Sequence, residues 1–173
     1  MVAPAVEGRN EPTVEDDLVI RNDGKPVVMI VDDDPQIREM VSDILADEYS
    51  MVKAQDGEAA LAILGIKKVD LVITDINMPV MGGNELLRRM KENELMRFIP
   101  VVILAMKTDV SDEIVSYNLG SDAFIPKPFL PAQLTAVVSG ILRKRSGLKD
   151  YYSSSASDQE MFYGVEMSSK DRQ

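Results

Sequence analysis

Short runs of β-branched and other apolar residues alternate with longer amphipathic stretches between residues 25 and 145. This alternation is typical of successive βαβ units, in which helices cover both faces of a parallel sheet. Five apolar runs predict strands: Val27–Val31, Met51–Ala54, Leu71–Thr74, Val101–Leu104 and Ala123–Ile125. The pattern therefore predicts an α/β domain.

The segments between these runs predict helices. Apolar residues recur at spacings of 0, 3, 4, 7 and 8 in 37–45 and again in 134–142, which places them on one helical face. The segments 56–65 and 83–93 are also helical in pattern, and 109–119 is weakly so. Five βα units in about 120 residues predict a flavodoxin-like doubly wound sheet of strand order 2-1-3-4-5 with five helices, whose binding crevice lies beyond the carboxyl ends of the strands.

The two ends of the chain differ from this middle part. Residues 1–24 carry six acids against two bases with little periodicity, which predicts a disordered lead or linker. Residues 146–173 are serine-rich with few apolar positions, and we interpret them as a tail or a linker toward an output domain. One domain over 25–145 agrees with a chain of 173 residues that is 45% hydrophobic.

Composition limits the chemistry. The net charge of -10 offers no basic stripe for nucleic acid, so this segment is not expected to bind DNA. Cysteine and histidine are both absent, so any phosphoryl transfer on this chain must use carboxylates. The first residues form neither a cationic leader nor an apolar run, and we expect a cytoplasmic protein.

Charged residues follow three of the predicted strands. Asp32 and Asp33 come after the first strand, Asp75 after the third and Lys127 after the fifth. In the expected strand order the first and third strands are neighbours, so these carboxylates should converge at one edge of the crevice. Such a cluster calls for a hard cation, and Mg²⁺ suits it best. A carboxylate nucleophile, a metal and a lysine are the parts required for phosphoryl transfer to Asp75.

Each of these residues also has an ordinary structural explanation. Asp34 followed by Pro35 reads as a helix N-cap with a first-turn proline, and we assign Asp34 that role. Any one of the other charged residues could equally be a solvated loop residue. The coincidence of the right residue types at strand ends on one rim is what favours a site.

The sequence strongly resembles the response-regulator receiver domain over residues 25–145. The resemblance rests on VVMIVDDDPQIREM, VDLVITDINMPVMGG, IPVVILA and GSDAFIPKPF. It implies that Asp75 is phosphorylated and that Asp33 ligates Mg²⁺ directly. It further implies that Asp32 ligates directly or through water, that Asn77 offers its backbone carbonyl to the metal, and that Lys127 binds the phosphoryl group.

The resemblance also concerns the conformational switch. Phe124 falls at the aromatic switch position, and Ala105 stands where the family usually has Ser or Thr. Met106 replaces a usually small neighbour, and the Lys127–Pro128 bond is expected to be cis, as is typical of the family. The missing hydroxyl at Ala105 predicts a weakened switch but an intact acceptor.

The implied partners are a histidine kinase as phosphodonor, a possible second copy bound through the face near the fifth strand, and a DNA-binding output domain. The segment LKDYYSS at 148–154 resembles the link to a helix-turn-helix output domain in hybrid two-component regulators, and equally fits a helix end with a polar tail. The chain is not expected to be an enzyme. The alternative is a degenerate receiver that acts only as an interaction domain.

Two other functions fit less well. A haloacid dehalogenase-type hydrolase needs an Asp-x-Asp pair after its first strand, whereas Asp75 follows the third and is paired with Asn77. A flavodoxin-like nucleotide or flavin binder needs a phosphate-cradling loop after the first strand. Without a metal, the three aspartates at that position would repel phosphate.

Overall fold

The computed structural model describes residues 24–106 and 110–155. The sheet in this part has five parallel strands in the order β2-β1-β3-β4-β5. Their bounds are Val27–Val31 (β1), Ser50–Ala54 (β2), Leu71–Thr74 (β3), Val101–Met106 (β4) and Ala123–Lys127 (β5). The predicted doubly wound fold and strand order are therefore confirmed.

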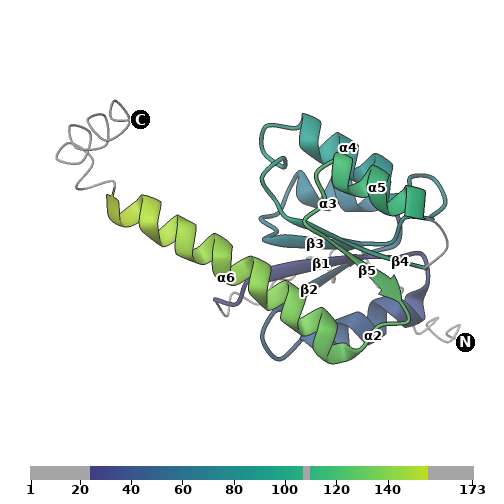
Figure 1. The fold of residues 1–173 in the computed structure, drawn as a ribbon, viewed down its shortest axis with the longest axis horizontal. Helices are drawn as coiled ribbons and strands as arrows, with labels where there is room; N and C mark the ends of the chain where they lie inside the picture. Colours follow the sequence, from purple (N-terminus) through teal and green to yellow (C-terminus); the bar gives the residue numbers. More distant parts are fainter. Residues whose placement is uncertain (1–23, 107–109, 156–173) are drawn as a thin grey trace, which may run out of the picture.

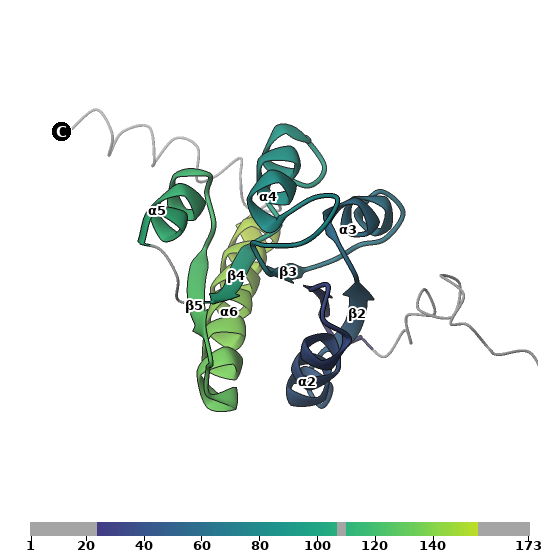
Figure 2. The ribbon, with the colours of Figure 1, turned by 90° about the vertical axis from the view of Figure 1, so that its right-hand side faces the viewer.

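Five helices of the described residues cover the two faces of the sheet, and all five fall where the pattern predicts them. Their bounds are Pro35–Leu45 (α2), Gly57–Leu64 (α3), Gly83–Glu92 (α4), Val110–Asn118 (α5) and Pro131–Ser155 (α6). Figures 1 and 2 show α2 and α6 on one face and α3, α4 and α5 on the other. The sheet is thus the middle layer of three.

The central strands bury side chains on both faces. Along β1, Met29 and Val31 pack into the apolar cluster under α3 and α4. Val28 and Ile30 pack into the cluster under α2 and α6. This double burial explains why β1 reads as a continuous apolar run rather than as an alternating one. It also fixes the carboxyl ends of the strands, where the polar residues gather.

Three strands are longer than the apolar runs predict. β2 begins one residue earlier, at Ser50. β4 and β5 continue through two further pairs, in which Ala105 lies opposite Pro126 and Met106 opposite Lys127. Our placement of Ala105 and Lys127 after their strands was therefore wrong, because parallel pairing at an edge tolerates a proline and a lysine that do not read as strand residues.

The last helix extends beyond the predicted domain. α6 runs to Ser155, so the boundary predicted at residue 145 falls inside it, and Figure 1 shows the helix projecting past the sheet. The predicted lead at 1–24 lies outside the described residues except for Gly24, as does 156–173. Among the helices that are described, none combines the length and apolar content needed to cross a membrane.

Candidate functional site

The turn between β1 and α2 supplies two of the predicted carboxylates. Asp32 is 1% exposed, and its Oδ1 accepts a hydrogen bond from the backbone N–H of Asp34 at 2.9 Å. Asp34 in turn accepts from the N–H of Gln36 at 2.9 Å and caps α2, as predicted. Asp33 is exposed. The turn therefore buries Asp32 and leaves Asp33 at the surface.

The end of β3 supplies the third carboxylate. The backbone N–H of Asp75 donates to the carbonyl oxygen of Val31 at 3.0 Å, which ties the end of β3 to β1. Asp75 Oδ1 accepts from the N–H of Ile76 at 2.8 Å. The Asp75 side chain is 12% exposed, so it remains reachable from solvent while its backbone is fixed by the sheet.

The three carboxylates form a cluster. An oxygen from each of Asp32, Asp33 and Asp75 lies within 4.8 Å of the other two. The pKa of Asp75 is raised above its usual range, chiefly by burial and further by the charges of Asp32 and Asp33. Lys127 and the N–H of Ile76 act in the opposite direction. The site thus holds more negative charge than one lysine compensates.

Lys127 pairs with two of the three carboxylates. Its Nζ is 2.8 Å from Asp32 Oδ2 and 3.6 Å from Asp75 Oδ2. Its side chain is 13% exposed, and the following Lys127–Pro128 bond is cis, as predicted. The structure therefore brings the lysine of β5 across β4 to the carboxylates that follow β1 and β3.

The donor set fits a small hard cation. Mg²⁺ binds oxygen at about 2.0–2.1 Å, so opposite ligands of an octahedral ion are about 4 Å apart. The spacing of the carboxylates of Asp32, Asp33 and Asp75 is close to this, and Asp33 opens to solvent, which leaves room for water ligands. Asn77 is exposed two residues after Asp75, and its backbone carbonyl as a ligand stays a prediction.

The loop between β3 and α4 is a strained segment. Val80 has a φ of 69°, and the N–H of Met81 donates to the carbonyl oxygen of Pro79 at 2.8 Å, which closes a γ-turn. A β-branched residue adopts this backbone conformation at a cost. The loop then meets α4, where a Cβ on Gly83 would lie 2.1 Å from the carbonyl oxygen of Asp75. Only glycine allows this approach.

The two predicted switch residues lie on the face of the sheet that α4 and α5 cover. Ala105 is 2% exposed and belongs to the apolar cluster of that face. Phe124 is partly buried and packs against the same cluster. Their roles in switching stay predictions.

Sequence reasoning missed one contact at the site. Arg38, on the first turns of α2, donates from Nη1 to the carbonyl oxygen of Asp32 at 2.6 Å. It fixes the turn that carries the buried carboxylate. The sequence indicates this contact only through the position of Arg38, four residues after the N-cap Asp34. Residues at this spacing share a helical face.

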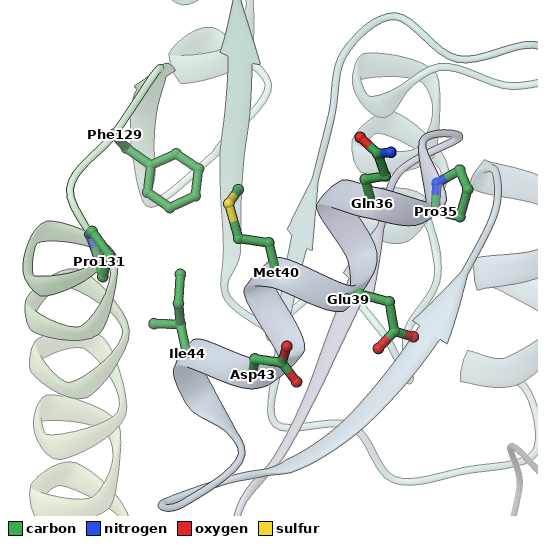
Figure 3. Close-up of a pocket in the computed structure, with 8 residues that line it drawn as sticks. All are labelled: Pro35, Gln36, Glu39, Met40, Asp43, Ile44, Phe129 and Pro131. Atoms are coloured by element: carbon green, nitrogen blue, oxygen red, sulfur yellow. The ribbon is translucent and has the colours of Figure 1, made fainter.

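A groove opens beside the site. It lies between α2 and the start of α6 and has a volume of about 720 Å³. Figure 3 shows Met40 and Ile44 of α2 facing Phe129 and Pro131 across it. Glu39 and Asp43 add negative charge to the wall formed by α2. The lining is completed by Pro35 and Gln36, which follow Asp34 directly.

Comparisons with known proteins agree with this geometry. A model of the response regulator receiver domain matches residues 28–139. The phosphate regulon transcriptional regulatory protein PhoB of Pseudomonas aeruginosa is 36% identical over 118 residues, which cover 68% of this chain and 52% of PhoB. The chain thus spans about half the length of that relative.

Solved structures give the same result. The chemotaxis protein CheY4 of Vibrio cholerae is 33% identical with a TM-score of 0.63, over 66% of this chain and 97% of CheY4. The phosphorylated cyanobacterial phytochrome response regulator RcpA is 28% identical with a TM-score of 0.60, over 68% of this chain and 91% of RcpA.

Proposed function

Because the chain belongs to the response regulator receiver domain family of two-component systems, we propose that Asp75 accepts a phosphoryl group from a histidine kinase. One observation carries this proposal. The buried backbone of β3 presents Asp75 with Lys127 Nζ 3.6 Å from Oδ2 and with two further carboxylates in the same cluster. The solved relative RcpA is itself a phosphorylated response regulator.

The reaction is a transfer between two nucleophiles. A carboxylate oxygen of Asp75 bonds to the phosphorus of a phosphohistidine while the phosphorus–nitrogen bond breaks. The nitrogen takes the bonding electron pair and then a proton, and Asp75 becomes an acyl phosphate. The Lys127 ammonium, already beside Asp75, pairs with an oxygen of the incoming group. The donor carries the activated phosphorus, so this chain needs no kinase activity of its own.

We propose that Mg²⁺ is the cofactor, held by Asp32, Asp33, Asp75 and the backbone carbonyl of Asn77. Mg²⁺ held by these residues would neutralise charge that develops on the phosphoryl oxygens. The chain's own residues meet the other requirement of the reaction, since the sheet fixes the backbones of Asp32 and Asp75. In-line transfer depends on this fixed position.

The groove beside the site offers a docking surface for the phosphodonor. Its apolar walls from Met40 and Phe129 suit the apolar face of a helix, and Glu39 and Asp43 would pair with basic residues flanking that face. Pro35 and Gln36, which line one part of it, directly follow the turn that carries Asp32 and Asp33, so a helix seated there would lie beside that turn. We propose that the donor helix of the kinase binds here.

An output domain is proposed from the relatives that this chain resembles. PhoB is named as a transcriptional regulatory protein, and the matched 118 residues cover 52% of it, so we propose a DNA-binding output domain and a cytoplasmic location. The face near β5 is the proposed contact for a second copy. It carries exposed apolar residues of α5 and of the end of β4, namely Met106, Val110, Ile114, Val115 and Tyr117.

Mass spectrometry tests the acceptor. Incubation with acetyl phosphate and Mg²⁺ should add the mass of one phosphoryl group, and Asp75→Ala should abolish the gain. Asp34→Asn is the matched control, because it changes a carboxylate at the same rim but keeps the helix cap, and it should still be phosphorylated. If the wild-type protein gains no mass while binding Mg²⁺, the chain is a degenerate receiver that acts as an interaction domain.

A further inference from the structure

Helix α5 is attached to the domain in an unusual way. Within its bounds the buried residue is Ser116, which is fully buried. Large apolar side chains of the same helix are exposed instead, with Val110 at 71%, Ile114 at 54% and Tyr117 at 48%. A helix normally buries its apolar stripe against the core. The hydrophobic effect therefore contributes little to holding α5 in place, and polar contacts must contribute more.

Ser116 makes that polar contact with α4. Its hydroxyl oxygen lies 2.9 Å from Oδ1 of Asn84 and 2.8 Å from the carbonyl oxygen of Asp112 in its own helix. A hydroxyl carries one proton, so it donates to one oxygen at a time. If the Asn84 amide is turned, its N–H donates to Ser116 while Ser116 donates to Asp112. Whether Ser116 donates to Asn84 or Asn84 donates to Ser116, one hydrogen bond joins α4 to α5.

Asn84 is in turn fixed to the phosphoacceptor loop. It is the second residue of α4, directly after Gly83. The N–H of Gly83 donates to the carbonyl oxygen of Ile76 at 2.9 Å, and the approach of Gly83 to the carbonyl of Asp75 leaves no room for a Cβ. A displacement of the Asp75–Ile76 backbone therefore reaches Asn84 through tightly packed atoms.

A link between the site and α5 through β4 is weakened in this chain. Ala105 on β4 carries no hydroxyl that could bond a phosphoryl oxygen. We propose that the Asn84–Ser116 hydrogen bond is the latch that couples the Asp75 loop to α5, and that phosphorylation releases or repositions α5 by acting on this bond. The coupling rests on the proposed phosphorylation of Asp75, whereas the attachment of α5 by the latch does not.

Hydrogen exchange tests the attachment without any phosphoryl group. Ser116→Ala and Asn84→Ala should each speed the exchange of the amides of Val115–Leu119 on the order of 5- to 10-fold, as expected for loss of one net hydrogen bond. Asn84→Asp keeps an acceptor oxygen and should retain protection. Ser139→Ala is the matched control, since the Ser139 hydroxyl bonds a carbonyl of its own helix, α6. Unchanged exchange in both alanine variants would overturn the latch.

The same measurement with the phosphoryl mimic beryllofluoride and Mg²⁺ tests the coupling. In the wild-type protein the mimic should speed exchange in α5, and in Ser116→Ala it should add little, because the latch is already absent. An equal fold-change in both proteins would show that the signal reaches α5 by another route. If the mimic slows exchange in the loop after Asp75 but leaves α5 unchanged, the coupling fails and the phosphoacceptor function stands. If it changes exchange in neither segment, the phosphoacceptor function fails, and the attachment of α5 is judged by the first experiment.

Discussion

Helices α4 and α5 lie side by side on one face of the sheet (Figures 1 and 2) but are held by different forces. α4 buries Leu86, Leu87 and Met90, each of which contributes about 1.5–3 kcal/mol on burial. α5 buries Ser116, and a hydrogen bond contributes about 0.5–1.5 kcal/mol net. The helix that carries the phosphoacceptor loop is therefore firmly fixed, and its neighbour is the element that can move.

The largest effect on the free energy of unfolding should come from truncating a buried side chain of α4. Leu86→Ala removes a fully buried side chain and should lower the free energy of unfolding by about 2–5 kcal/mol. Ile114→Ala, at a position 54% exposed on α5, should change it by less than about 0.5 kcal/mol. Urea denaturation of both variants measures the difference. Equal losses would remove the contrast between the two helices.

Restoring a hydroxyl on β4 should strengthen the link between the site and the α5 edge. A hydroxyl at position 105 would donate a charge-assisted hydrogen bond to the phosphoryl group, worth about 1.5–3 kcal/mol. Ala105→Thr should therefore increase dimerisation in the presence of beryllofluoride, as measured by sedimentation. Ala105 is 2% exposed, so Ala105→Ser serves as the smaller companion variant. No increase in either variant would show that switching does not use this bond.

The sequence predicted the fold well because the central strands are buried on both faces. β1 and β3 read as unbroken apolar runs, and their ends were placed correctly. The end of β5 was missed because Pro126 and Lys127 lack strand propensity, and their pairing with β4 depends on the neighbouring strand.

The carboxylates and the lysine of the site could be predicted because they follow from the strand order. Asp32, Asp33, Asp75 and Lys127 converge because parallel strands align their carboxyl ends, which the strand order alone determines. The bond between Asn84 and Ser116 depends instead on which sides of α4 and α5 face each other. A serine and an asparagine 32 residues apart carry no sequence signal of that contact.

Mg²⁺ should stabilise the folded protein by binding the carboxylates that follow β1 and β3. Binding to the folded state alone raises the free energy of unfolding by about 1.4 kcal/mol at about ten times Kd. Asp33→Ala should lose this gain, while the apo variant should be no less stable than the wild type because one repulsive charge is removed. Thermal unfolding with Mg²⁺ and with a chelator measures both. An unchanged gain in Asp33→Ala would exclude Asp33 as a ligand.

The smallest effect concerns the strained turn beside α4. Val80→Gly should relieve about 1–2 kcal/mol of backbone strain, offset by about 0.5–1 kcal/mol of added chain entropy in the unfolded state. The expected net gain in the free energy of unfolding is about 0.5–1 kcal/mol. Urea denaturation measures it, with Pro79 left in place. A loss of stability would mean that the Val80 side chain, although 76% exposed, makes a contact that exceeds the strain.

The most direct test of the account identifies the phosphorylated residue itself. After incubation with acetyl phosphate and Mg²⁺, borohydride reduction converts an aspartyl phosphate to homoserine, and peptide mass spectrometry locates the changed residue. The cluster of Asp75 with Lys127, Asp32 and Asp33 predicts homoserine at position 75 and at no other aspartate. Homoserine at Asp32 or Asp33, or at no position while the protein carries a phosphoryl group, would contradict it.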